Sequence, residues 1–228
     1  MLTVVTLPDM FTMSTRNGAQ IMNSQKNPKP YHHGDLRRSL MEEAAQLMEE
    51  EGLESLTLRK VAQRVGVSHT APYRHFQDKA EILCAVASLG FERLTAAMSE
   101  VAPTPTESAN TRLLELGVAY VCHGVANPAY FRAMFREHPS PSEELKVSRQ
   151  QAFQLLFDAV DAGIQSKQFR QADAQLMAMT AWTQVHGIAT LLVDGLLRDE
   201  TSAQESPIDH ADAIARALIP NFIEGLVN

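Results

Sequence analysis

Apolar residues recur at helical spacing along most of this chain, and no segment shows the strict alternation of a half-buried strand. The sharpest short pattern begins at Thr57, which stands where the side chain of an N-cap accepts a hydrogen bond. Four apolar positions follow on one face of a helix: Leu58, Val61, Ala62 and Val65. Gly66 suits the left-handed end of that helix, and Ser68 can cap a second helix of about two turns. The segment therefore predicts a helix-turn-helix.

The polar positions of the same segment indicate what it binds. Five basic residues fall between positions 57 and 79, against one acid: Arg59, Lys60, Arg64, Arg74 and Lys79. His69, Thr70 and Tyr73 add hydrogen-bonding groups on the face of the second helix that we expect to be exposed. A short polar helix with basic flanks fits the major groove of DNA, where side chains read base edges and cations hold phosphates. The alternative is an ordinary helical pair with a solvated, charged face.

A long run of matching positions extends from His33 to Phe91. It comprises Gly52-Leu53, Leu56-Thr57-Leu58-Arg59, Val61-Ala62, Val65-Gly66-Val67-Ser68, Tyr73-Arg74-His75-Phe76, Asp78-Lys79 and Ile82-Leu83. On these positions the segment resembles the DNA-binding domain of the TetR family of bacterial transcriptional regulators. One position departs from the family pattern, because Pro72 stands where leucine is more common. The proline falls in the first turn after Ser68, so we expect the second helix to form despite it.

The resemblance implies roles for the matching residues. Arg59 would reach a base from the first of the two helices. The base-facing positions of the second helix would be His69, Thr70 and Ala71. The positions that hold phosphates would be Thr57, Tyr73, His75 and Lys79, and Ser68 completes the DNA-contacting set.

The net charge of −7 looks unsuited to a DNA-binding protein until it is divided along the chain. Residues 81–228 hold eighteen acids and ten Lys or Arg, a balance of −8, whereas residues 22–80 hold eight acids and nine Lys or Arg. Most acids of the second group fall on the predicted first helix, and we expect them to lie away from the DNA-reading surface: Glu42, Glu43, Glu49, Glu50 and Glu51. The chain thus reads as a locally basic tip on an acidic body that repels DNA. Plain surface solubility is the alternative for the body.

Length and composition set the class of protein. The 228 residues, 45% of them hydrophobic, suit one or two globular domains. We divide them into a disordered tail (1–33), a DNA-binding domain (34–80) and a regulatory and dimerisation domain (81–228). Cys84 and Cys122 stand singly in helical runs, which fits reduced thiols in a cytoplasmic protein, and neither has metal-ligand spacing. No apolar run reaches the roughly 18 residues of a membrane span, and we expect no metal, no cofactor and no membrane partner.

The rest of the chain predicts helices only, so the expected fold is all-α with about nine helices. The expected ranges are 35–51, 79–101, 108–126, a short helix opened by Asn127-Pro128, 143–166, 173–197 and 209–226. The helix at 173–197 is apolar nearly all round, so we expect burial on several sides. The helix at 209–226 has an apolar stripe wider than one partner needs. We therefore expect these last two helices to form a four-helix interface in a homodimer.

Two groups of residues in the body raise the question of a binding site. Trp182, His186 and Gly187 form a W-x-x-x-H-G sequence that resembles the tryptophan–histidine–glycine motif of some TetR-like proteins. Eight side chains from consecutive helices could line a cavity for a small, mostly hydrophobic effector: Tyr120, His123, Phe131, Met134, Phe157, Met177, Trp182 and His186. Ordinary core packing of the same residues is the alternative.

The function that these patterns favour is sequence-specific regulation of transcription. We expect a ligand-responsive repressor that binds a palindromic operator as a dimer and has no enzymatic activity. One alternative is a small-molecule hydrolase or other enzyme that uses His123, His186 and a carboxylate such as Asp194, although no nucleophile motif or phosphate loop accompanies them. A second alternative is a DNA-binding protein that responds to no effector.

Overall fold

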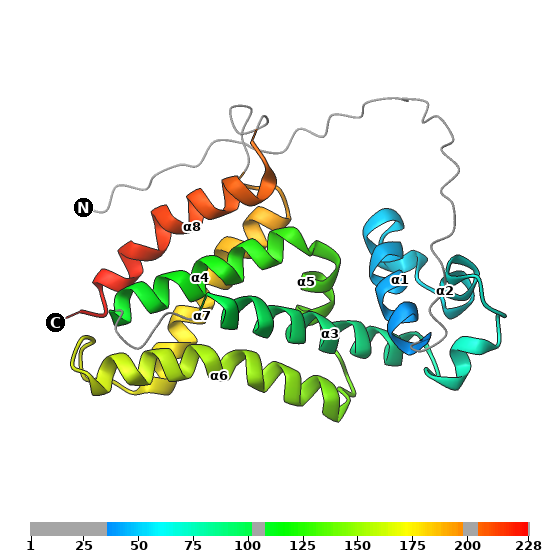
Figure 1. Cartoon of the computed structure of the whole chain (residues 1–228), viewed down its shortest axis with the longest axis horizontal. Helices are drawn as coiled ribbons and strands as arrows, with labels where there is room; N and C mark the ends of the chain where they lie inside the picture. Colours follow the sequence, from blue (N-terminus) through cyan, green and yellow to red (C-terminus); the bar gives the residue numbers. More distant parts are fainter. Residues whose placement is uncertain (1–35, 102–107, 198–204, 228) are drawn as a thin grey trace, which may run out of the picture. The chain divides into compact units, whose positions relative to one another are not determined.

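The helical periodicity of the sequence is realised in the computed structural model, which describes residues 36–101, 108–197 and 205–227 (Figure 1). The α-helices of these residues are α1 (Leu36–Glu51), α2 (Leu58–Val65), α3 (Lys79–Glu100), α4 (Ala109–Ala126), α5 (Pro128–Phe135), α6 (Glu143–Gln165), α7 (Ala174–Val193) and α8 (Pro207–Glu224). Two short 3₁₀ helices, Leu53–Ser55 and Ala71–Arg74, flank α2, and the described residues contain no strand. The predicted all-α fold is confirmed. The predicted tail, residues 1–33, lies outside the described residues.

Local capping fixes where most of these helices begin. The N-cap side chain accepts a hydrogen bond from a backbone N–H of the first turn in α2, α3, α4, α6, α7 and α8. These caps are Thr57, Asp78, Ser108, Ser142, Asp173 and Ser206. Because a cap needs only residues close in sequence, the predicted helix starts agree with the observed ones within two residues.

Helix α3 forms the centre of the core. Every residue from Ile82 to Phe91 is buried, and the helix packs against α1, α4, α5 and α6. At Gly90 the contact with α5 is so close that an added Cβ would lie 2.7 Å from Sδ of Met134. The helix has a mean hydropathy of 1.3 over 18 residues and is long enough to cross a membrane, but 67% of that window is buried within the protein. Burial in a protein core accounts for its apolar composition.

Helix α7 differs from its prediction. It too is long and apolar enough to span a membrane, yet only 28% of its apolar window is buried. One face packs against α4, α6 and α8 through Met177, Ala178, Ala181, Val185 and Ala189. The opposite face is uncovered in the single chain, where Leu176 is 67% exposed and Leu191 is 41% exposed. The expectation of burial on several sides is therefore wrong for the chain by itself.

Candidate nucleic-acid interface and cavity

The first helix of the helix-turn-helix forms as its sequence predicts. Oγ1 of Thr57 accepts a hydrogen bond from the backbone N–H of Lys60 at 3.2 Å. Gly66 ends the helix with φ of 81°, a left-handed conformation that favours glycine. The N–H groups of Gly66 and Val67 both donate to the carbonyl oxygen of Ala62, each at 3.0 Å. These bonds fix the turn that leads to the second helix.

The second helix is shorter than predicted. The expected α-helix of about two turns is wrong, because the structure contains a 3₁₀ helix of four residues, Ala71–Arg74, and Ser68 does not cap it. Oγ of Ser68 instead lies 3.2 Å from Oγ1 of Thr70. Pro72 explains the change: an α-helix starting after Ser68 would need a hydrogen bond from the missing N–H of this residue. Starting the helix at Ala71 moves Pro72 into the first positions, where no N–H is required.

The nine residues expected to contact DNA differ in how exposed they are. Six of the nine are exposed: Thr57, Arg59, Ser68, His69, Thr70 and Tyr73. Ala71, His75 and Lys79 are half-buried. Tyr73 is 58% exposed although it is aromatic, so its ring is free to contact a ligand. Pro72 and Phe76 are buried beneath the surface and anchor the short helix.

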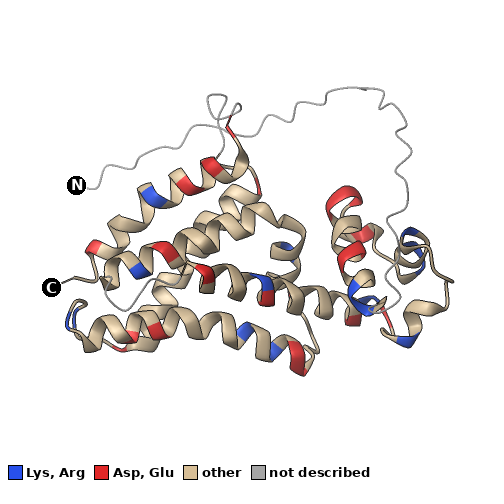
Figure 2. Cartoon of the chain, viewed as in Figure 1, with Lys and Arg blue, Asp and Glu red and all other residues tan. Residues whose placement is uncertain are grey.

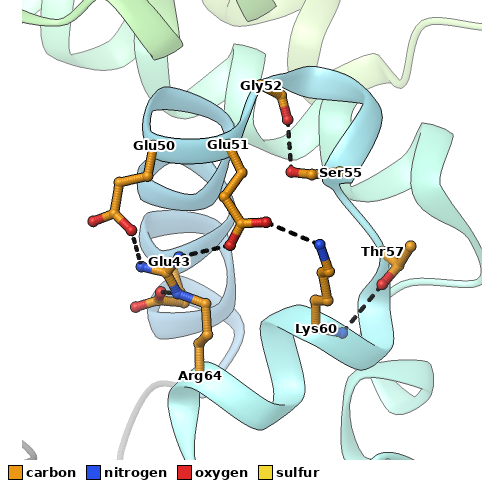
Figure 3. A network of polar contacts seen from close by, with 8 residues as sticks. All are labelled: Glu43, Glu50, Glu51, Gly52, Ser55, Thr57, Lys60 and Arg64. Carbon is orange, nitrogen blue, oxygen red and sulfur yellow. Dashed lines mark hydrogen bonds and ion pairs between the residues drawn. The ribbon is translucent and has the colours of Figure 1, made fainter. Parts of the chain in front are cut away.

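A network of ion pairs ties α2 to the acids of α1 (Figure 3). The guanidinium of Arg64 lies 2.5 Å from Glu43, 2.7 Å from Glu50 and 3.6 Å from Glu51. Nζ of Lys60 lies 2.9 Å from the carboxylate of Glu51. Partial burial opposes the charged form of Arg64, but the hydrogen bonds and charges of Glu50 and Glu43 outweigh it and raise the pKa of the guanidinium.

The network accounts for three of the α1 acids. Glu43, Glu50 and Glu51 neutralise two basic residues of α2, Arg64 and Lys60, and neither of these belongs to the expected DNA-contacting set. A third cation, Lys79, donates to the carbonyl oxygen of Leu53 at 3.0 Å and lies 3.9 Å from Glu54. Arg59 and Arg74 are exposed, and neither makes an ion pair or hydrogen bond with the part of the chain that the structure describes. These two arginines are the cations most available to DNA. Sequence reasoning placed Arg59 in the DNA-contacting set and omitted Arg74.

A cavity of about 580 Å³ lies in the body, between α3, α4, α5, α6, α7 and α8. Its lining is mostly apolar and aromatic and includes Phe91, Leu116, Tyr120, Phe153, Leu156 and Trp182. Of the eight residues expected to line a cavity, Tyr120, Met134 and Trp182 do so. The other five do not contribute to this lining: His123, Phe131, Phe157, Met177 and His186.

A hydrogen-bonded cluster stands behind one wall of the cavity. The indole N–H of Trp182 donates to the hydroxyl oxygen of Tyr120 at 3.3 Å, and that hydroxyl lies 2.9 Å from Nδ1 of His186. Phe135 packs against all three rings, with its ring centroid 4.4 Å from that of His186. Burial raises the pKa of Tyr120 and lowers the pKa of His186, so both groups are held neutral. The tryptophan and histidine of the W-x-x-x-H-G sequence thus serve to hold Tyr120 at the cavity wall.

His123 lies apart from this cluster. Its Nε2 atom is buried and has no hydrogen-bond partner among the described residues. Burial, and secondarily the positive charge of Arg93, lower the pKa of His123 to about 4. The side chain is therefore a neutral core histidine at physiological pH.

The cavity also has charged lining residues that sequence reasoning missed. Arg136, Lys146 and Arg149 contribute to it, and no Asp or Glu of the described residues does. A signal for two of them was present, because Lys146, Arg149 and Phe153 follow one another at spacings of three and four along α6. That spacing places the two cations on the same helix face as an aromatic residue of the apolar core.

Comparisons with known proteins cover both parts of the chain. Residues 40–86 match a family model described as bacterial regulatory proteins, tetR family. Residues 113–217 match a model described as tetracyclin repressor-like, C-terminal domain. A search of curated protein sequences found no match.

Several solved structures are similar. A protein of unknown function from Rhodococcus sp. RHA1 has 31% sequence identity and a TM-score of 0.71, over 88% of this chain and 100% of that chain. The TetR family transcriptional regulator PfmR from Thermus thermophilus has 24% identity and a TM-score of 0.62, over 83% of this chain and 96% of its own. A bacterial regulatory protein of the tetR family from Rhodococcus RHA1 has 21% identity and a TM-score of 0.64, over 82% and 96%. The last two similarities establish a shared fold.

Proposed function

Because this chain belongs to the TetR family of bacterial transcriptional regulators, we propose that it is a ligand-responsive repressor that binds a palindromic operator as a homodimer. It acts on DNA in the cytoplasm. The DNA-binding domain comprises residues 34–80 and the regulatory and dimerisation domain residues 81–228, with α3 joining the two. The exposed polar residues around Ala71–Arg74 bind DNA, and the apolar cavity of the body binds the ligand.

The proposal rests on two arginines of the helix-turn-helix, Arg59 and Arg74, which are exposed and make no ion pair among the described residues. Both can donate hydrogen bonds to DNA, and the exposed side chains of Thr70 and Tyr73 add hydroxyl groups. Arginine donates two parallel hydrogen bonds to guanine or to a phosphate, which suits both base reading and positioning. Arg59, His69, Thr70 and Ala71 read bases, and Thr57, Ser68, Tyr73, His75 and Lys79 hold the backbone. Arg74 adds to the backbone contacts, and Lys79 contributes only after it releases the carbonyl oxygen of Leu53.

Selection of duplexes from a random pool by the full chain tests this function. We expect enrichment of a two-fold symmetric sequence, with each mismatch costing roughly 1–3 kcal/mol. Arg59→Ala and Thr70→Ala should relax the base preference, whereas Tyr73→Phe, which removes a phosphate contact, should weaken all duplexes alike. Equal binding of the wild type to enriched and scrambled duplexes would refute the proposal. Loss of discrimination in Tyr73→Phe with retention in Arg59→Ala would reverse the assigned roles.

The uncovered faces of α7 and α8 support a dimer. Leu191 of α7 and Leu218 of α8 are 41% and 46% exposed. On helix α7, no atom of the described residues lies within 4 Å of a Cβ added at Gly187, so no contact among them requires a glycine there. A glycine inside a helix costs roughly 1 kcal/mol relative to alanine, and close approach of a partner helix would account for it. A four-helix interface would hold the DNA-binding domains of two chains so that they reach two successive major grooves.

Charge on that face tests the dimer. The double variant Leu191→Glu and Leu218→Glu should sediment as a monomer and bind single half-sites only, because burying two carboxylates is unfavourable. Val147→Glu is the matched control, since Val147 is 45% exposed on α6, away from this face. A wild type that is monomeric at micromolar concentration would contradict the proposal.

The contacts of α6 support a response to ligand. Lys146 and Arg149 contribute to the cavity lining, and in the first turn of the same helix Glu144 pairs with Arg37 of α1 at 2.7 Å. Helix α3 also links the two parts, because Arg93 lies 2.8 Å from Glu42 of α1. A ligand that displaces α3 or α6 would therefore move α1 and with it the helix-turn-helix. Such a ligand lowers operator affinity only by its preference for one of the two arrangements.

The alternatives gain less support. His186 pairs with Tyr120, Asp194 lies 3.5 Å from Arg132, and no hydrogen bond or ion pair in the described part of the chain joins these two to His123. A hydrolytic site would need such groups within reach of one substrate atom. We therefore propose a regulator without enzymatic activity. An effector-independent protein would have no need of a cavity of ligand size.

A further inference from the structure

The three cations that line the cavity all come from the end of α5 and the start of α6. Arg136 directly follows α5, and Lys146 and Arg149 lie in the first two turns of α6. Figure 2 shows the basic positions of α6 directly after its acidic first turn. The rest of the lining is uncharged, and it is apolar on α3, α4 and α8. The charge is therefore concentrated rather than spread around the cavity.

One face of α6 shows the change from polar to apolar most clearly. Along it, the lining passes from Lys146 and Arg149 through Phe153 to Leu156. Leu156 lies ten positions after Lys146, which corresponds to about 15 Å at 1.5 Å per residue. A molecule with a charged head and an apolar body of similar length would match this face.

The cations are incompletely neutralised by the protein. Nη1 of Arg136 is buried and has no hydrogen-bond partner among the described residues. Arg149 is exposed at the edge of the lining; its guanidinium lies 5.8 Å from the ring centroid of Phe91 and makes no ion pair with the described part of the chain. Lys146 pairs with Glu143 at 3.2 Å on the exposed side of the helix. A buried guanidinium nitrogen without a partner is unfavourable, and an anion bound to the same guanidinium would relieve the cost.

We infer that the cavity binds an apolar molecule that carries one anionic group, a carboxylate or a phosphate. Arg136 and Arg149 hold the anion, because a guanidinium donates two parallel hydrogen bonds to either group. The apolar part lies against Phe153, Leu156 and Trp182. This inference rests on the proposed function, since it names the chemical class of the effector.

Titration of the full chain with three ten-carbon probes tests the head group. Decanoate, decyl phosphate and decan-1-ol share an apolar tail, and the fluorescence of Trp182, the single tryptophan, reports binding. Below micelle-forming concentrations, at least one anionic probe should bind about tenfold or more tightly than the alcohol, because charge-assisted hydrogen bonds are lost with the alcohol. The tighter of the two anions identifies the source of the head group. Equal affinity for all three probes would overturn the inference, as would a response to acetate or inorganic phosphate that matches that to the probes.

Variants locate the anion. The double variant Arg136→Met and Arg149→Met keeps the apolar stems and removes both charges. Its affinity for decanoate should fall to that for decan-1-ol, while the affinity for the alcohol stays unchanged. Arg170→Met is the matched control, because Arg170 is exposed and does not line the cavity. Retention of the preference for the anion in the double variant would overturn the inference, and if that variant fails to fold, the three-probe comparison in the wild type decides it.

Operator binding, measured in parallel, separates this inference from the proposed function. If decanoate binds but does not weaken the affinity for DNA, the ligand class is correct and the proposed regulation by ligand is refuted. A protein that binds its operator but none of the three probes leaves the DNA-binding function intact and refutes the ligand class.

Discussion

The helix-turn-helix and the cavity both contain clustered cations, but the two regions treat them in opposite ways. In the helix-turn-helix, Arg64 and Lys60 are held by acids of α1 at distances of 2.5 to 3.6 Å (Figure 3). In the cavity, Arg136 and Arg149 have no carboxylate beside them in the described part of the chain. The helix-turn-helix, which is expected to bind a polyanion, thus has most of its cations paired with its own acids. The cavity, which is expected to bind a small apolar molecule, has cations that are not paired with acids among the described residues.

The difference shows that availability, rather than the number of cations, marks a binding surface. A paired cation must give up its partner before it can hold a phosphate, so its net contribution to binding is small. We therefore expect Arg59 and Arg74, which are exposed and unpaired among the described residues, to contribute their full interaction with DNA. The acidic partners also reduce non-specific attraction to DNA, which leaves more of the affinity to base contacts.

The largest effect on folding stability that we expect depends on pH and on the cost of placing a charge in the body. The pKa of His123 is about 4 in the folded chain, against 6.5 for an ordinary histidine. Between these values the unfolded chain binds more protons, so stability is lost as the pH falls through this window. His123 should account for about 1–2 kcal/mol of the stability lost between pH 7 and pH 5. Urea denaturation of His123→Gln should show a smaller pH dependence.

The exposed His69→Gln is the control for that experiment and should keep the pH dependence of the wild type. A His123→Gln variant that loses as much stability between pH 7 and pH 5 as the wild type would show that the side chain is solvated. Protonation of His123 would then carry no cost in folding stability.

An intermediate effect should distinguish a structural arginine from a functional one. Arg64→Met removes three ion pairs and should lower the free energy of unfolding by about 1 kcal/mol, because the pairs are only partly buried. Arg59→Met, on the same helix, should leave stability unchanged, since Arg59 has no partner in the described residues. Urea midpoints at neutral pH measure both. Equal stability of the two variants would mean that the network contributes nothing to folding.

The smallest effect concerns the link between the two regions. Glu144→Gln removes the ion pair with Arg37 and leaves the cavity lining intact. We expect decanoate to bind this variant as it binds the wild type, but to weaken DNA binding by about twofold to fivefold less, since an exposed pair is worth up to about 1 kcal/mol. Glu137→Gln, an exposed acid in the α5–α6 loop, is the control. An unchanged response in Glu144→Gln would place the link elsewhere, with the Arg93–Glu42 pair as the next candidate.

The sequence predicted what depends on neighbouring residues. Thr57, Asp78 and Gly66 determine where helices begin and end through bonds within a few positions, so those boundaries were readable. Pro72 is visible in the sequence, but its effect depends on which helical position the proline occupies, and that position is set by where the helix starts.

Features that depend on packing between distant segments could not be predicted. Arg64 meets Glu43 across the α1–α2 contact, and no local pattern specifies that the two helices cross there. The cavity shows the same limit. Tyr120 and Trp182 line it as expected from the sequence. Arg136 follows α5 in a loop, and it lines the cavity only because of how α5 and α6 pack. The uncovered face of α7 was likewise read as buried, because apolar composition alone does not say whether the partner is the same chain or a second one.

The affinity of the full chain for its enriched operator, at one ionic strength, tests most directly the claim that unpaired cations bind DNA and paired ones do not. The two variants to compare are Arg59→Gln and the double variant Arg64→Gln with Glu50→Gln, which removes a cation together with one of its partners. We predict a loss of about 5- to 150-fold for Arg59→Gln, equivalent to roughly 1–3 kcal/mol, and less than about threefold for the double variant. Equal losses in the two variants, or a larger loss in the double variant, would contradict the account.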